Sequence, residues 1–282
     1  MKRTTLAEIF ADTQKLYNTN AKLVSACDYS RKNHVFVPAD EKIDCERNRF
    51  EQEAKIIVSK KRTFEAAEVY ARAGKKVAVL NFANSYHPGG GVVHGARAQE
   101  ECLCRISTLY DSIASPEMRE QFYNPHCKAD NDLANDDIIY TPSVLIFKSD
   151  TATPKLMPES EWFFADVLTC AAPCLSRDIK PLENETLTKI HESRLRHILD
   201  VACKYEAEVV ILGAFGCGAF SNPPEVVAAA YKNLLPDYRR AFSTIEFAVF
   251  CRDFETQNYD VFAAALGHYA GKILLRRKRD SE

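Results

Sequence analysis

The sequence predicts an α/β fold in which helices pack in layers against a mixed β-sheet. Short apolar runs, typical of buried strands, alternate along the chain with longer amphipathic stretches, typical of helices. Chains that alternate in this way fold as stacked layers of helix and sheet. The 282 residues suffice for one large domain or two small ones, and no linker, repeat or low-complexity tract divides them. We therefore expect one domain over residues 1–282, with about the first 60 residues as a helical accessory segment packed on the core.

The elements expected in the first half of the chain have boundary signals of their own. Thr63 can cap a helix, and Gly74 can end that helix in the left-handed conformation. Residues 18–48 show a mixed pattern with one short strand. The expected elements in chain order are a helix from Thr4 or Thr5 to about Tyr17, strands at His34–Val37 and Ile56–Val58, a helix from Thr63 to Gly74, a strand at Val77–Leu80 and a helix at Cys102–Ile113.

The second half continues the alternation. Residues 111–137 are polar, and continuous apolar runs after them indicate buried strands. The expected elements are a short helix near Glu117–Phe122, strands at Ile138–Phe147 and Trp162–Cys170, a helix at Leu187–Tyr205, a strand at Val209–Leu212, a helix opened by Pro223 or Pro224, a strand at Ile245–Phe250 and a last helix at Tyr259–Tyr269.

Composition narrows the function classes. Hydrophobic residues make up 46% of the chain and charged residues 27%, and a net charge of −2 argues against direct sequence-specific binding of nucleic acid. No apolar run approaches the ~20 residues of a membrane span, and the N-terminus lacks a signal-peptide core, so we expect a cytoplasmic protein that does not bind membranes. The ten cysteines are scattered and lack zinc spacing. We expect reduced thiols, no metal site and no cofactor.

The stretch from Asn81 to Tyr110 carries the strongest functional signal. After a buried strand come Asn84, the triplet Gly89, Gly90 and Gly91, and then Gln99, Glu100 and Glu101 at the start of a helical pattern. A glycine triplet costs backbone entropy, so it indicates a close approach or a turn where a Cβ would clash. Each part also has a simpler explanation: the triplet as a flexible turn, Asn84 as a turn residue, and the glutamates as charge favourable at a helix N-terminus.

A second glycine-rich loop follows a later buried strand and precedes a helix. Its residues Gly216, Cys217, Gly218, Ala219 and Phe220 would aim backbone N–H groups at one point, which suits a diphosphate. The loop lacks the lysine of a P-loop, and it is only a partial dinucleotide fingerprint, so a tight turn between strand and helix is the better explanation when the loop is taken alone. Two such loops at strand ends of one α/β chain favour a shared crevice.

Asn84, the glycine triplet, the seven-residue spacer (residues 92–98) and Gln99-Glu100-Glu101 together resemble the signature of poly(ADP-ribose) glycohydrolases of the microbial type, which are catalytic macrodomains. The second glycine loop matches in the right order, and the resemblance covers roughly Thr63 to His268. It implies a three-layer α/β/α macrodomain-like sandwich with a mixed sheet and an N-terminal helical extension.

The resemblance also implies roles for individual residues. Glu101 would protonate the leaving 2′-oxygen and then activate water, while Glu100 would hold ribose hydroxyls, because glycoside cleavage needs a carboxyl proton donor. Phe220, which could equally be a core residue, would lie against the distal ribose and diphosphate. The implied substrate-binding residues are Asn84, Gly89, Gly90, Gly91, Gln99, Gly216, Cys217, Gly218, Ala219 and Phe220. For the adenine, the sequence offers only Asn258, Tyr259 and Phe262 as candidates.

The expected function is therefore removal of ADP-ribose units from poly(ADP-ribose) by cleavage of ribose–ribose O-glycosidic bonds, acting from chain ends. The expected partners are ADP-ribose, poly(ADP-ribose) and ADP-ribosylated macromolecules. One alternative is a hydrolase of mono-ADP-ribose adducts on protein or nucleic acid. Another is a reader module that binds ADP-ribose without cleaving it, although binding alone would not require the glutamate pair.

Overall fold

The computed structural model describes residues 1–177 and 181–277, with residues 268–277 described by their backbone only. The described residues form a seven-stranded mixed sheet in the order β1-β4-β5-β3-β6-β7-β2. Strands β5, β3, β6, β7 and β2 run parallel, whereas β4 and β1 are antiparallel to their neighbours. The strands are β1 (Val35–Val37), β2 (Lys55–Ser59), β3 (Val77–Phe82), β4 (Ile138–Ile146), β5 (Phe163–Cys170), β6 (Val209–Leu212) and β7 (Thr244–Ala248).

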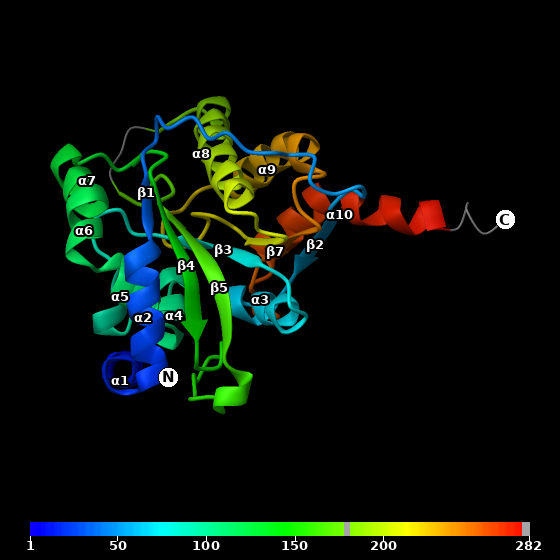
Figure 1. Ribbon diagram of the computed structural model, residues 1–282. Coiled ribbons are helices and arrows are strands. Elements are labelled where there is room, and N and C mark those ends of the chain that lie inside the picture. Colours follow the sequence, from blue (N-terminus) through cyan, green and yellow to red (C-terminus); the bar gives the residue numbers. More distant parts are fainter. Residues whose placement is uncertain (178–180, 278–282) are drawn as a thin grey trace.

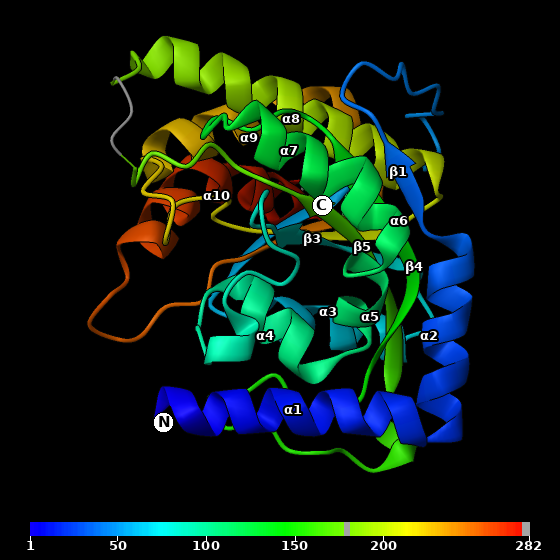
Figure 2. The same cartoon turned by 90° about the vertical axis from the view of Figure 1, so that its left-hand side faces the viewer.

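Helices cover both faces of this sheet, which confirms the predicted three-layer α/β/α architecture (Figures 1 and 2). One face carries α8 (Asn184–Lys204), α9 (Pro224–Tyr238) and α10 (Gln257–Arg277). The other carries α3 (Thr63–Arg72), α4 (Gln99–Ile106), α5 (Leu109–Ile113), and the short α6 (Pro116–Met118) and α7 (Asn124–Ala129). A large hydrophobic cluster fills each side of the sheet.

The N-terminal helices α1 (Arg3–Thr19) and α2 (Ala21–Asn33) lie against this second side. Figure 2 shows α1 on the outer side of α4, and α2 packs beside β4. Thr13 on α1 donates a hydrogen bond to the carbonyl of Arg105, and Arg105 in turn donates to the carbonyl of Leu6 at 3.2 Å. The helix therefore braces the segment that carries the glutamate pair. Within the described residues, no helix is both long and apolar enough to cross a membrane.

Most predicted elements are present, but helix α2 was missed, the last helix runs to Arg277 instead of Tyr269, and one predicted helix is divided. Helix α2 buries only Leu23, Ala26, Cys27 and Ser30, and the polar Ser30 in that stripe hides its hydrophobic periodicity. The expected helix Cys102–Ile113 is in fact α4 and α5, because Ser107 leaves the helix to pair with Ile146 at the end of β4. Helix α4 begins at Gln99, so the glutamate pair lies inside its first turn.

The topology places the two glycine-rich loops side by side. Strand β3 lies between β5 and β6 and is parallel to both. The carboxyl ends of all three strands therefore open at the same edge of the sheet. The first loop follows β3 and the second follows β6. Ligands of open α/β sheets bind in such a crevice outside the carboxyl ends of the strands.

Candidate active site

Gln99 anchors the first turn of α4 to β3. Its Oε1 accepts the N–H of Phe82 at 2.9 Å, and its Nε2 donates to the carbonyl of Leu80 at 2.7 Å and to Thr63 Oγ1 at 3.1 Å. These contacts fix the helix start that carries the next two side chains. Both glutamates then lie at the positive end of the α4 dipole, which favours negative charge.

Glu100 is almost completely buried and is held by three donors. Its Oε2 accepts the N–H of Asn84 at 2.8 Å, and its Oε1 accepts from Asn81 Nδ2 and from the N–H of Gly89, both at 3.3 Å. The pKa of Glu100 is raised to about 8, mainly by burial and also by the nearby charge of Glu101, although the three donors act to lower it. Near neutral pH, this pair of carboxyl groups therefore holds a proton.

Glu101 is held at one oxygen only. Its Oε1 accepts the N–H of Gly91 at 2.9 Å. Its Oε2 is buried and has no hydrogen-bond partner among the described residues. A buried carboxyl oxygen without a partner is costly, and such atoms occur at sites that complete themselves with a proton, water or ligand. Both oxygens of Glu100 accept hydrogen bonds, so Glu101 is the member of the pair with an oxygen that no described group occupies.

The glycine triplet is shaped by the glutamates themselves. Gly89 and Gly90 have φ angles of 69° and 55°, which favour glycine. A Cβ added to Gly90 would lie 2.5 Å from Glu101 Oε1 and 3.2 Å from Glu100 Oε2, so both carboxyl groups converge beneath this residue. The N–H groups of Gly89 and Gly91 bind the glutamates, and that of Gly90 binds the carbonyl of His87 at 2.9 Å. The close approach predicted from the triplet includes the protein's own carboxyl groups.

Asn84 closes the turn beside Glu100. Its Oδ1 accepts the N–H groups of Tyr86 at 2.9 Å and His87 at 2.8 Å. Its Nδ2 donates to no acceptor in the described parts of the chain, so it is available to a ligand hydroxyl. Asn84 is thus both the turn residue and a possible ligand contact, the two functions that the sequence left open.

The second loop leaves its backbone donors free. Within residues 213–222, all of which are described, the N–H groups of Phe215, Cys217, Ser221 and Asn222 bind carbonyls of the same loop. Those of Gly216, Gly218, Ala219 and Phe220 have no protein acceptor there. A Cβ added to Gly218 would meet nothing within 4 Å, so the space beside it is open. Four unpaired N–H groups around open space form a site suited to an anion.

Asn222 and His191 fix this loop from behind, and sequence reasoning missed both. Asn222 Nδ2 donates to the carbonyls of Pro173 at 2.7 Å and Gly216 at 3.1 Å, and its Oδ1 contacts His191 Nε2 at 2.9 Å. Burial lowers the pKa of His191 to about 4, so its ring is neutral at neutral pH. The one sequence signal was Asn222 itself, a polar residue between a glycine loop and the prolines that open α9.

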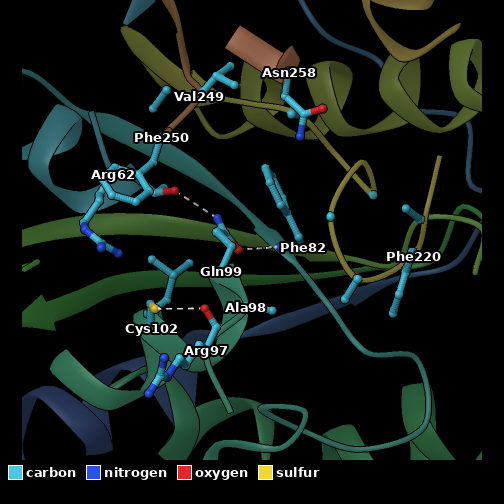
Figure 3. A pocket seen from close by; sticks show the side chains of 18 of the residues that line it. Arg62, Phe82, Arg97, Ala98, Gln99, Cys102, Phe220, Val249, Phe250 and Asn258 are labelled. Atoms are coloured by element: carbon cyan, nitrogen blue, oxygen red, sulfur yellow. Dashed lines mark hydrogen bonds between the residues drawn. The ribbon is translucent and has the colours of Figure 1, made fainter. Parts of the chain in front are cut away.

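A cavity of about 280 Å³ lies between the start of α4 and the second glycine loop. Asn84, the glycine triplet, Glu100 and Glu101 are not among the residues that line it. Gln99 lies on one wall, and Gly216, Gly218, Ala219 and Phe220 lie on the other. Figure 3 shows Gln99 and Phe220 across the cavity from one another, with Phe250 and Asn258 toward one end. Phe220 also packs against the core cluster beneath α8 and α9, as does Cys217.

The structure separates the three adenine candidates. Asn258 lines the cavity, Tyr259 lies outside it beneath Lys60, and Phe262 is fully buried against Phe247. Arg62 and Phe250, which sequence reasoning missed, also line the cavity, and the guanidinium carbon of Arg62 lies 3.9 Å from the ring centroid of Phe250. Within the described residues, no group of three or more His, Cys, Asp or Glu side chains could hold a metal ion.

The fold and sequence are similar to those of solved bacterial enzymes. The structure of poly(ADP-ribose) glycohydrolase (PARG) from Thermomonospora curvata is 28% identical, with a TM-score of 0.83 over 93% of this chain and 99% of that chain. The same enzyme bound to the inhibitor ADP-HPD has a TM-score of 0.80 at 28% identity, over 93% of this chain and 99% of that chain. PARG from Deinococcus radiodurans in complex with ADP-ribose is 28% identical, with a TM-score of 0.75 over 86% of this chain and 98% of that chain.

No curated protein shows significant similarity to the sequence. The family described as microbial-type PARG, catalytic domain, matches residues 4–149, which is just over half of the 282 residues and includes α1, the first glycine loop and the glutamate pair. The chain belongs to this family, the catalytic domains of microbial-type poly(ADP-ribose) glycohydrolases.

Proposed function

We propose that this protein is a poly(ADP-ribose) glycohydrolase that cleaves ribose–ribose O-glycosidic bonds from chain ends and releases ADP-ribose. Membership of the family supports the activity. The observation that carries the proposal is the state of Glu101, a buried carboxyl group with one oxygen fixed by Gly91 and the other without a partner in the described chain. A module that only bound its ligand would not need such a group.

The geometry supports one orientation of ADP-ribose. The diphosphate lies against the free N–H groups of the loop from Gly216 to Phe220. The distal ribose then lies beside Phe220 and above the glutamates, where Asn84 Nδ2 and Glu100 reach its hydroxyls. The adenosine end extends toward Phe250 and Asn258. This assignment extends the substrate-binding role expected for the second loop, and it gives the first loop mainly the task of holding the carboxyl groups.

Cleavage proceeds by proton transfer and attack of water. Glu101 donates a proton to the leaving 2′-oxygen as the bond from that oxygen to C1″ breaks. The positive charge that develops on the distal ribose is stabilised by the nearby carboxylate and by the substrate's own diphosphate. Water then attacks C1″ and gives its proton to Glu101, which restores the enzyme. Glu100, held by three donors, orients the ribose throughout.

The test compares Glu101→Gln with the wild type on poly(ADP-ribose) of defined length. Loss of a positioned general acid lowers the rate by about 10²–10⁴-fold, whereas binding of ADP-ribose changes little. Glu120→Gln, on the exposed Glu120 of the segment between α6 and α7, serves as the control and keeps full activity. Turnover by Glu101→Gln within a few-fold of wild type would refute the mechanism.

The same assay distinguishes the substrate classes. Release of single ADP-ribose units from the first time point supports action from chain ends, whereas early release of longer fragments contradicts it. Cleavage of mono-ADP-ribosylated protein with no effect on the polymer would instead indicate the mono-ADP-ribosyl hydrolase. Binding of ADP-ribose without turnover of either substrate would indicate a reader.

A further inference from the structure

Three side chains form a stacked cluster outside the cavity. The guanidinium carbon of Arg177 lies 4.8 Å from the ring centroid of Tyr86. Arg177 Nη1 lies 2.9 Å from Asp132 Oδ1, and the Tyr86 hydroxyl donates to the same oxygen at 3.3 Å. The aromatic ring and the carboxylate thus hold the guanidinium plane from two directions. We call these three residues the Tyr86–Arg177 platform.

The platform joins the two loops that form the proposed site. On one side, Tyr86 follows Asn84 by two residues, and the N–H of Asn84 binds Glu100. On the other side, Leu175 precedes Arg177 by two residues, and its N–H donates to the carbonyl of Phe220 at 2.9 Å. Asp132 is fixed to the same segment, because its carbonyl accepts the N–H of Cys174 at 2.7 Å. The platform therefore lies next to both residues proposed to contact the distal ribose.

The stability of the ion pair itself does not account for this arrangement. The side chain of Arg177 remains 49% exposed, and an exposed ion pair contributes little to stability. A planar guanidinium fixed on an aromatic ring is, in contrast, a surface on which nucleobases stack. Its charge also attracts the phosphates that accompany a nucleotide.

We propose that the Tyr86–Arg177 platform binds the adenine of the leaving unit, that is, the ADP-ribose unit whose 2′-oxygen is released. This inference rests on the proposed function. The leaving 2′-oxygen belongs to an adenosine ribose, so an adenine is attached to the same sugar that Glu101 protonates. That adenine lies outside the cavity and next to the distal ribose, and the platform lies at the same position. The platform thus makes the enzyme favour a polymer over an isolated ADP-ribose adduct.

The experiment compares two ligands in the Glu101→Gln background, in which binding is measured without turnover. ADP-ribose fills only the proposed cavity, whereas a dimer of ADP-ribose also supplies the adenine of the leaving unit. We expect calorimetry to show tighter binding of the dimer than of ADP-ribose. Adding Arg177→Met should weaken dimer binding by about five-fold or more, the effect of losing one stacked base. ADP-ribose binding should stay unchanged.

Further variants separate stacking from charge and from general damage. Arg177→Lys keeps the positive charge but lacks the planar guanidinium group, so it should weaken dimer binding as much as Arg177→Met does. The control is Arg196→Met in α8, because Arg196 forms an ion pair with Asp237 at the same 2.9 Å and is 42% exposed. This control should leave the affinities for both ligands unchanged.

Three results would overturn the platform proposal while leaving the proposed function intact. The first is that the Glu101→Gln variant binds ADP-ribose and the dimer with equal affinity. The second is that Arg177→Met weakens the binding of both ligands equally. The third is that Arg177→Lys keeps the full affinity for the dimer. If the Glu101→Gln variant does not bind ADP-ribose at all, both the proposed function and the platform proposal are refuted.

Discussion

The two glycine-rich loops look alike in sequence but use their backbone donors in opposite ways. In the first loop, all three glycine N–H groups bind acceptors of the protein, and two of those acceptors are the carboxyl groups of Glu100 and Glu101. In the second, the N–H groups from Gly216 to Phe220 are mostly unpaired within the described chain. Under the proposed function, the first loop therefore holds the catalytic groups, and the second receives the ligand. Changes in the first loop should act on turnover, and changes in the second on affinity.

The largest expected effect is that of Gly90→Ala. The added Cβ would lie 2.5 Å from Glu101 Oε1, so the carboxyl group must move. We expect kcat to fall by about 100-fold or more, as for the loss of a positioned acid, while the Kd for ADP-ribose changes little. Gly74→Ala is the matched control, because Gly74 has a similar positive φ of 75° but a Cβ there meets nothing within 4 Å. An equal fall in kcat for both variants would mean that backbone strain, and not the collision, is responsible.

Next in size is Asn222→Ala behind the second loop. Truncation leaves a buried imidazole N–H and two carbonyl groups without their partner, which should lower the free energy of unfolding by about 1–3 kcal/mol. The loop should lose its shape, so the Kd for ADP-ribose should rise while kcat at saturating substrate stays near wild type. Asn33→Ala, which removes an exposed amide bonded to the carbonyl of Tyr29 at 2.8 Å, should alter neither quantity. A fall in kcat with unchanged affinity would contradict the expectation that the second loop acts on affinity and the first on turnover.

Gly218→Ala should give a smaller effect of the same kind. The residue has no positive φ and open space beside it, so alanine should stabilise the free protein by about 0.4–1 kcal/mol. If a diphosphate occupies that space, the methyl group displaces it, and we expect ADP-ribose affinity to fall about ten-fold, which corresponds to about 1.4 kcal/mol. Gly267→Ala in α10 also meets nothing within 4 Å and should stabilise the protein without changing affinity. Unchanged affinity in Gly218→Ala would place the diphosphate elsewhere.

Local patterns predicted the layers and the two loops because each depends on a short stretch of sequence. The strand β3, the glycine triplet and the glutamates all lie within residues 77–101, so their order already indicated a site. The helix α2 was missed because its buried stripe contains Ser30, whose hydroxyl bonds the carbonyl of Pro142 at 2.8 Å, more than one hundred residues away. A polar residue satisfied by such a distant partner cannot be distinguished from a surface residue in the sequence.

The supporting residues of the site could not be predicted for the same reason. His191 reaches the second loop only because α8 packs across the sheet, and Arg177 reaches Tyr86 only because β5 lies beside β3. The different uses of the two glycine loops also escaped prediction, since the partners of backbone N–H groups depend on tertiary structure. The sequence pointed to both loops as candidates, but it did not show that the backbone N–H groups of the first loop bind the protein's own carboxyl groups.

The last comparison concerns how the stability contributions of the two loops respond to pH. Burial raises the pKa of Glu100 from 4.5 to about 8, so its contribution to stability is fully present below pH 4.5 and is lost as the pH rises through 8. Burial lowers the pKa of His191 from 6.5 to about 4, so its contribution is present above pH 6.5 and is lost as the pH falls through 4. The two contributions oppose each other between pH 4.5 and 6.5, and only Glu100 acts between pH 6.5 and 8.

Denaturant unfolding at several pH values measures these contributions to the free energy of unfolding. Each variant is compared with the wild type, so that the contributions of all other titrating groups cancel. Relative to Glu100→Gln, the wild type should lose up to ~1.4 kcal/mol per pH unit between pH 6.5 and 8. Relative to His191→Gln, it should gain stability as the pH rises from 4 to 6.5 and then stay level. Parallel curves for wild type and Glu100→Gln above pH 6.5 would show that Glu100 is ionised in the folded protein at neutral pH, which contradicts the raised pKa of its carboxyl group.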